Sequence, residues 1–247
     1  MDAREAVEDD YALFDSLRES RIPPGMFIGD GLRVVRKMLE HGVATRILCA
    51  AEWLHRLPEA KGVELVVAPK ERLHALVGFK LHQGLMALGR IPPPKEPRGS
   101  FFVALDGLSN AENVGAILRT CAGFGVDGVF LDRVSPSPWM RRAVRVSIAA
   151  PLVVPTHVVD DLPAAIRPLN AWAAHIHGSK VDYRSVDYRG PCCVVLGGED
   201  KGVTPEVLAA CRGVIYIPMA EGWDCLNVAG SAAVLLAEVR RQRDCKS

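Results

Sequence analysis

The sequence predicts an α/β protein with two domains, a small N-terminal α/β domain and a larger C-terminal domain built on a parallel sheet. Short apolar runs alternate with stretches of helical periodicity, which is the pattern of α/β folds. In the second half the apolar runs are almost continuous, as in parallel strands that helices cover on both faces. Consecutive prolines in 91–99 suit neither helix nor sheet, so we place a linker there, between domains at 1–90 and 100–247.

Composition restricts the class of protein. Of the 247 residues, 49% are hydrophobic and 24% are charged, as in soluble globular proteins with a sizeable core. No apolar run is long enough to cross a membrane, and the acidic start lacks the apolar segment of a secretory signal. Seven scattered cysteines without a CxxC pair favour reduced thiols in the cytoplasm. The net charge of +1 argues against a uniformly basic protein that coats nucleic acid, although local basic clusters still suit phosphates.

The N-terminal domain is predicted from one amphipathic helix and three apolar runs. The helix covers 31–42, "GLRVVRKMLEHG", and ends on Gly42. Its apolar residues recur at helical spacing and are Leu32, Val35, Met38 and Leu39. Strands are predicted at 44–50, 63–69 and 82–89, with a helical stretch at 52–60 between the first two. This alternation indicates a small α/β domain.

The C-terminal domain is predicted to alternate strands and helices more plainly. The strands are expected at 101–106, 128–131, 151–154, 171–175, 191–197 and 213–218. The helices are expected at 111–123, 140–149, 160–168, 204–211 and 226–242. Parallel sheets bind their ligands at the carboxyl ends of the strands. We therefore expect the functional site in the loops that follow these ends, three of which contain unusual residues.

The first of these loops leads into "LSNAENVGAILRTCAGFG", residues 108–125. Ser109 and Glu112 have the spacing of a capping box, so the helix is expected to begin there. Gly115 and Arg119 lie one turn apart, opposite the apolar stripe of the helix, with Asn113 at its flank. A glycine inside a helix costs about 1 kcal/mol relative to alanine. Either the close approach of a ligand beside Arg119 or helix–helix packing with a solvated arginine explains the pattern.

The second and third loops combine glycines with polar side chains. In "VVLGGEDKG", residues 194–202, Gly197 and Gly198 end a buried strand and precede Glu199. Glycines allow the backbone to press against a ligand, but a tight turn before the next helix explains the pair equally well. In 215–239 a strand, a loop and a helix rich in small residues follow one another. Asn227, at the start of that helix, is either a cap or a functional side chain.

Two further groups of polar residues leave their roles open. Arg141, Arg142 and Arg145 form a basic cluster, for which phosphate contact and a solvated helix face are equally good interpretations. His175 and His177 share one face of a predicted strand without a third ligand, so no metal site is predicted. The absence of GxGxxG and of a P-loop after any strand argues against an ordinary nucleotide-dependent enzyme of doubly wound fold.

Three stretches, taken together and in their order, resemble the motifs of one family. They are "NAENVGAILRTCAGFG", "VVLGGEDKGVTPEV" and "IPMAEGWDCLNVAGSAAVLLAE". Each closely resembles a motif of the SpoU (TrmH-like) branch of the SPOUT RNA methyltransferases, and the resemblance spans 100–242. The stretches "FIGDGLRVVRKMLEHG" and "HQGLMALG" also resemble the small substrate-binding domain of that family.

The resemblance implies an enzyme that transfers methyl from S-adenosylmethionine to a ribose 2′-hydroxyl in RNA without a metal. It also implies a deep trefoil knot in the C-terminal domain and a homodimer formed through that domain. The N-terminal domain resembles those of rRNA-modifying members, which favours rRNA over tRNA as the substrate. In this family the second and third motifs hold the cofactor, and the corresponding residues here are Leu196, Gly197, Gly198, Ile217, Met219 and Leu226.

The resemblance also implies which side chains reach the RNA side of the site. These are Asn113, Arg119, Glu199 and Asn227, with Arg141, Arg142 and Arg145 as further candidates for RNA binding. Because a guanidinium stays protonated in proteins, we expect Arg119 to hold the 2′-oxygen or an adjacent phosphate rather than to act as a base.

The third motif departs from the family pattern. Cys225 stands where the family usually has serine, and cysteine is a poorer hydrogen-bond partner. Glu221, Trp223 and Asp224 in the preceding loop are also unusual. These departures leave a second interpretation open, an RNA-binding homodimer of the same fold with weak or lost catalysis.

Overall fold

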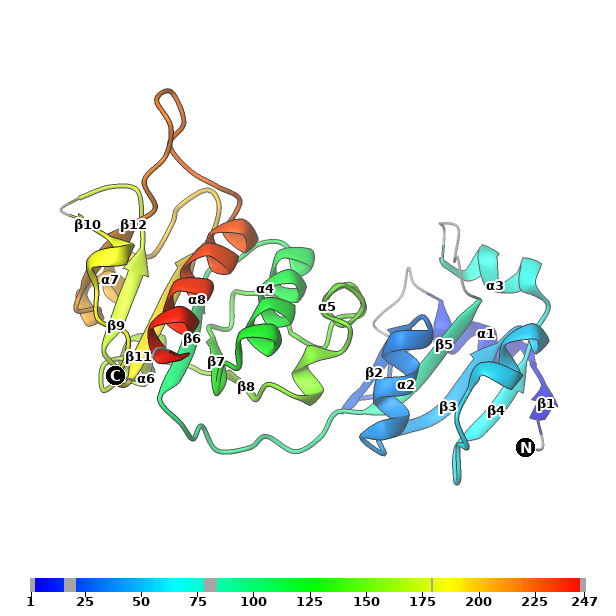
Figure 1. Ribbon diagram of the computed structural model, residues 1–247. Coiled ribbons are helices and arrows are strands. Elements are labelled where there is room, and N and C mark those ends of the chain that lie inside the picture. Colours follow the sequence, from blue (N-terminus) through cyan, green and yellow to red (C-terminus); the bar gives the residue numbers. More distant parts are fainter. Residues whose placement is uncertain (1–2, 16–20, 78–83, 179, 245–247) are drawn as a thin grey trace. The chain divides into compact units, whose positions relative to one another are not determined.

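The computed structural model describes residues 3–15, 21–77, 84–178 and 180–244 of the chain (Figure 1). Contacts divide the chain into two units. The N-terminal unit is Met1–Pro93 with Trp139–Leu152, and the C-terminal unit is Pro94–Pro138 with Val153–Ser247. The segment 139–152 thus belongs to the N-terminal unit, whereas the sequence interpretation assigns it to the C-terminal domain. The expected linker, 91–99, contains neither helix nor strand.

The N-terminal unit is built on a five-stranded mixed sheet with the strand order β1-β4-β3-β5-β2. Strands β1, β3 and β4 run parallel, and β5 pairs antiparallel with β3 and β2. Its strands are β1 (Ala3–Glu5), β2 (Met26–Asp30), β3 (Ala44–Cys49), β4 (Glu64–Val67) and β5 (Leu85–Arg90). Its helices are α1 (Glu8–Phe14), α2 (Leu32–Glu40), η2 (Ala51–Arg56), α3 (Lys70–Val77), α5 (Arg141–Ser147) and η3 (Ala150–Leu152). His82 and Gln83, which begin the last strand predicted for this domain, lie outside the described residues.

Neighbouring residues of this sheet enter two different cores. Phe27 and Leu85 pack in one cluster with Met38 of α2, whereas Ile28 and Met86 pack in another. Successive side chains of a strand point to opposite faces, so the sheet is covered on both sides. Helix α2 buries Val34, Val35 and Met38, while Leu32 and Leu39 of the predicted apolar stripe are partly buried.

Helix α5 is tied to the N-terminal unit by a buried arginine. The Nε and Nη2 atoms of Arg141 donate to the two carboxylate oxygens of Asp30, each at 2.8 Å, and Nη1 donates to the carbonyl of Phe14 at 2.8 Å. Arg141 is only 5% exposed. The prediction that Arg141 binds RNA is therefore wrong for this structure, because its donors are engaged in the core. Arg142 is exposed and Arg145 half-buried, and RNA contact by these two stays a prediction.

The C-terminal unit contains a seven-stranded sheet with the order β10-β12-β9-β11-β6-β7-β8, in which each neighbouring pair is parallel. Its strands are β6 (Phe101–Asp106), β7 (Gly128–Leu131), β8 (Thr156–Val158), β9 (Ala171–Ala174), β10 (Lys180–Asp182), β11 (Cys192–Gly197) and β12 (Gly213–Tyr216). Its helices are α4 (Ala111–Phe124), α6 (Leu162–Ile166), η4 (Tyr183–Ser185), α7 (Pro205–Ala210) and α8 (Val228–Asp244). The prediction of an α/β fold with a parallel sheet is confirmed.

Helices cover both faces of this parallel sheet. Leu162 and Ile166 of α6 and Val207 of α7 pack on Phe102 and Val195 of the central strands. Helices α4 and α8 pack against each other over the opposite face (Figure 1). No helix within the four described ranges is long and apolar enough to cross a membrane.

Two local predictions for this half of the chain are wrong. No strand forms at 151–154, because the chain leaves α5 through Ile148 and Ala149, both with φ of 54°, and enters a short 3-10 helix. Strand β8 begins only at Thr156. The cap of α4 is Asn110, whose side chain accepts from the backbone N–H of Glu112, rather than Ser109.

Candidate active site

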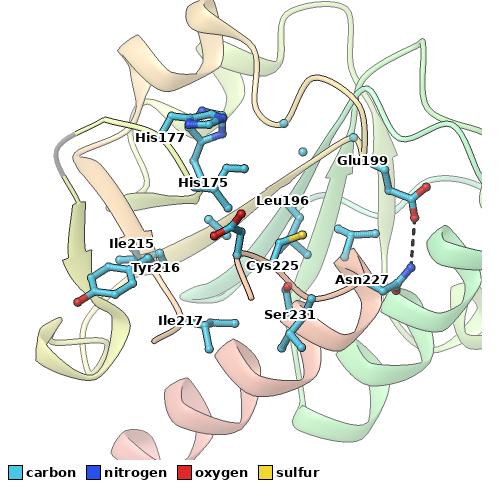
Figure 2. Close-up of a pocket in the computed structure, with 18 of the residues that line it drawn as sticks. His175, His177, Leu196, Glu199, Ile215, Tyr216, Ile217, Cys225, Asn227 and Ser231 are labelled. Carbon is cyan, nitrogen blue, oxygen red and sulfur yellow. Dashed lines mark hydrogen bonds between the residues drawn. The ribbon is translucent and has the colours of Figure 1, made fainter. Parts of the chain in front are cut away.

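A cavity of about 540 Å³ opens at the carboxyl ends of β9, β11 and β12 in the C-terminal unit (Figure 2). Ala174, Leu196 and Tyr216 line it from these strands, and Ser231 and Leu235 line it from α8. The segments after β9 and β11 and the loop between β12 and α8 complete the lining. A volume of this size and a lining of apolar side chains with a few polar groups are typical of small-molecule sites.

The six residues that the resemblance assigns to the cofactor all line this cavity. They are Leu196, Gly197, Gly198, Ile217, Met219 and Leu226. They come from the end of β11 and from the segment after β12, two strands that β9 separates in the sheet. Their contact with a cofactor stays a prediction.

The chain itself explains why Gly197 and Gly198 lack side chains. A Cβ on Gly197 would lie 2.1 Å from the carbonyl carbon of Gly202, and one on Gly198 would lie 2.3 Å from the carbonyl oxygen of Gly107. The Gly202 N–H donates to the Gly198 carbonyl at 2.9 Å, which closes the second-motif loop on itself. These glycines thus allow three backbone segments to cross at close range, a requirement separate from that of any ligand.

Polar side chains, one of them the buried carboxylate of Asp106, hold the loops around this crossing. Asp106, the last residue of β6, accepts from the backbone N–H of Thr204 at 2.6 Å. Burial raises the pKa of Asp106. Asp132 accepts from the Gly107 N–H at 2.8 Å, and Ser135 Oγ accepts from the Leu108 N–H at 3.0 Å. Sequence reasoning missed these residues, although a carboxylate that ends an apolar strand is a visible signal for Asp106.

Three of the four predicted catalytic side chains meet in one hydrogen-bonded network. Asn113 Nδ2 donates to Glu199 Oε1, and Asn227 Nδ2 donates to the same oxygen at 3.2 Å and to Asn113 Oδ1 at 3.4 Å (Figure 2 shows the Glu199–Asn227 bond). Glu199 and Asn227 also line the cavity. Asn227 Oδ1 accepts from the Ala229 N–H at 2.9 Å, so this residue caps α8 and belongs to the network at the same time. A carboxylate that accepts two amide N–H groups retains lone pairs for a hydroxyl donor.

Arg119 is not brought into this network. Its side chain is exposed on α4, does not line the cavity, and makes no hydrogen bond or ion pair with any residue that the structure describes. Gly115 is buried rather than solvent-facing, and α4 packs against α8. A buried Gly115 agrees with a role in packing, while the guanidinium of Arg119 is left available to a ligand outside the chain.

Two histidines also line the cavity, beyond what the sequence indicated. The rings of His175 and His177 follow β9, with centroids 5.6 Å apart. Burial lowers the pKa of His175, and the neighbouring His177 adds to this shift. Across the described ranges, no group of three or more His, Cys, Asp or Glu side chains is placed to hold a metal ion. Their position at the end of a predicted strand was the sequence signal that they lie near the site.

Comparison with known proteins gives the family and the fold. Residues 100–237 match the SpoU rRNA Methylase family. An uncharacterized tRNA/rRNA methyltransferase of Mycobacterium tuberculosis is 31% identical over 256 residues, which cover 94% of this chain and 88% of that protein. A TrmH-family protein of known structure from Porphyromonas gingivalis is 26% identical, with a TM-score of 0.81 over 96% of this chain and 99% of its own.

A second solved structure shares the fold at lower identity. The SpoU methyltransferase AviRb from Streptomyces viridochromogenes, solved in complex with the cofactor AdoMet, is 21% identical, with a TM-score of 0.82 over 98% of this chain and 100% of its own. Fold and site together define an α/β protein with a ligand cavity at the carboxyl edge of a parallel sheet. The chain belongs to the SpoU family of RNA methyltransferases, and the family resemblance seen in the three motifs is confirmed.

Proposed function

We propose that the protein transfers a methyl group from S-adenosylmethionine to a ribose 2′-hydroxyl of RNA, with rRNA as the favoured substrate and tRNA as the alternative. The observation that carries the proposal is the Asn113–Glu199–Asn227 network at a small-molecule cavity. Family membership and relatives that are tRNA/rRNA methyltransferases support it. The cytoplasm is the compartment that this proposal implies.

The lining of the cavity suits S-adenosylmethionine. Leu196, Ile217 and Leu226 offer apolar surface to an adenosyl group, and Gly197 and Gly198 line the same cavity. Bound there, the cofactor would supply a methyl group on a sulfonium, an electrophile that needs no metal. Ile217, Met219 and Leu226 would hold it from the third motif, and Leu196, Gly197 and Gly198 from the second.

The polar network supplies what a weak nucleophile needs. Methyl transfer to a hydroxyl requires the oxygen to be aligned and partly deprotonated. Glu199 is fixed by the two amide groups and would accept the hydroxyl proton, while Asn113 and Asn227 orient the ribose. Arg119 would hold the 2′-oxygen or a neighbouring phosphate and so stabilise developing negative charge. Such a site reads the hydroxyl that distinguishes RNA from DNA.

Binding and methylation are tested separately. Calorimetry on chelator-treated protein is expected to show that S-adenosylmethionine binds without added metal. Mapping of 2′-O-methylation in total RNA, from cells with and without the protein, is expected to show one or a few positions that depend on it. Binding that requires a divalent ion, or an unchanged methylation map together with no transfer to purified RNA, would contradict the proposal.

The deep trefoil knot and the homodimer through the C-terminal unit are part of the same proposal. Small residues of α8 that are exposed or half-buried, namely Ala229, Gly230 and Ala233, support an association surface there. Because 139–152 packs in the N-terminal unit, a chain cut near Ser100 would lose the partner of that segment, so the full chain is the right sample. We expect it to sediment as a dimer at micromolar concentration, and a monomer under those conditions would contradict the prediction.

One observation favours a second candidate function, an RNA-binding homodimer with weak catalysis. Cys225 is an exposed thiol at the position where the family usually has a serine. If the protein binds S-adenosylmethionine and RNA but shows no measurable methyl transfer to unmodified RNA, this alternative would be favoured over the first.

A further inference from the structure

The loop between β12 and α8 carries an exposed tryptophan beside the cavity. Each residue of 220–227 is exposed, and the loop stands away from the body of the unit (orange in Figure 1). Trp223 is 72% exposed and lines the cavity. Exposing a large aromatic ring forgoes much of the stability that its burial gives, so a partner for the ring is expected.

Trp223 is part of a group of exposed apolar side chains. Ile176 is 44% exposed and Leu226 is 39% exposed, and both line the same cavity as Trp223. Glu199 and Asn227, the proposed ribose-binding residues, line it as well. A nucleotide whose ribose lies at that network would thus have apolar surface close by for its base.

The charges beside Trp223 exclude one kind of contact. Glu221 and Asp224 flank it in the sequence, and both are exposed. Carboxylates repel phosphates, so the RNA backbone is disfavoured at this loop. The flat face of a base carries no negative charge, so it can stack on the indole ring without this repulsion, and every base has such a face.

We propose that Trp223 stacks on an unpaired base of the RNA, at or next to the nucleotide that is methylated. This inference rests on the proposed function and adds the substrate class, an RNA in which the base is not stacked in a duplex. Proteins read single-stranded loops and bulges in this way, because splayed bases offer their faces to aromatic side chains.

Tryptophan fluorescence tests the proposal directly. The chain has four tryptophans, and the other three, Trp53, Trp139 and Trp172, are half-buried. Acrylamide therefore quenches Trp223 most strongly. Adding short oligoadenylate, or total RNA, is expected to protect Trp223 from acrylamide.

Trp223→Ala is expected to weaken RNA binding by roughly 5- to 150-fold, as for the loss of one base stack, and Trp223→Phe to restore most of it. Val134→Ala removes another exposed apolar side chain, 79% exposed and away from the cavity; it is the matched control and should bind RNA normally.

Salt separates stacking from phosphate contact. Loss of a phosphate contact reduces the slope of log K against log salt, whereas loss of a stack does not. The Trp223→Ala and wild-type lines should therefore be parallel. The proposal would be overturned if the salt slope of Trp223→Ala differed from wild type, or if this variant bound RNA with wild-type affinity. It would also be overturned if S-adenosylmethionine alone protected Trp223 from acrylamide, or if protection without RNA rose with protein concentration. If the wild-type chain methylates RNA and Trp223→Ala binds RNA equally well, only the stacking is rejected. If the wild-type chain neither binds nor methylates RNA, the proposed function is rejected as well.

Discussion

Replacing Arg141 with alanine is expected to lower the free energy of unfolding of the N-terminal unit by about 3–5 kcal/mol. The guanidinium is 5% exposed and makes two hydrogen bonds of 2.8 Å to Asp30, which is itself 6% exposed. Removing it leaves a buried carboxylate without its partner and frees the Phe14 carbonyl that it also contacts. Urea unfolding of the full chain, followed by a probe in the N-terminal unit, measures the effect.

The neighbouring arginine provides the control. Arg142 is exposed, and Arg142→Ala is expected to change the free energy of unfolding by no more than about 0.5 kcal/mol. Replacing both Arg141 and Asp30 with apolar residues of similar volume should recover much of the lost stability, because no charge is then left buried alone. Equal effects of Arg141→Ala and Arg142→Ala would show that the buried pair contributes nothing.

The burial of this ion pair could not be predicted from the periodicity of the sequence. The arginine-rich stretch around Arg141 has the composition of a solvated or RNA-binding helix face, and nothing local distinguishes Arg141 from Arg142. The distinction comes from Asp30, which lies 111 positions earlier in the chain. Burial of a charge depends on a partner in space, and one sequence does not show that pairing.

The glycine pair shows a similar limit. The sequence correctly indicates that Gly197 and Gly198 need close approach of other atoms, and the cavity residues predicted from the motifs do gather at one strand edge. It does not indicate that the approaching atoms belong to Gly107 and Gly202 of the same chain. Strand order brings Gly107 close, since β11 lies directly beside β6 in the sheet, and Gly202 approaches through the closed loop that follows β11.

The strands themselves were predictable where they are apolar and buried on both faces. β6 and β11 are such strands, and the sequence locates them almost to the residue. β10, Lys180–Asp182, is a short exposed edge strand without an apolar run, and it has no signal of its own. Its pairing with β12 comes from the rest of the fold.

Replacing Arg119 with alanine is expected to leave folding and cofactor binding intact while reducing methyl transfer by about two or more orders of magnitude. The side chain is exposed and has no partner among the described residues, so the stability should change by no more than about 0.5 kcal/mol. Turnover should fall because the guanidinium is proposed to stabilise charge on the ribose oxygen or to hold a phosphate next to it. Single-turnover transfer to the RNA found by methylation mapping measures this, with calorimetry of S-adenosylmethionine as the check on binding.

Matched variants separate this role from a general loss of charge. Arg167 is also exposed and lies outside the cavity. Arg167→Ala removes the same charge from the same unit and should transfer methyl at the wild-type rate. Arg119→Lys should rescue little, because an ammonium does not reproduce the planar fork of a guanidinium. Cys225→Ser, which restores the usual family residue, should leave transfer unchanged or raise it. Near-native transfer by Arg119→Ala would remove this residue from the reaction, and the network of Asn113, Glu199 and Asn227 would then have to align and deprotonate the ribose hydroxyl alone.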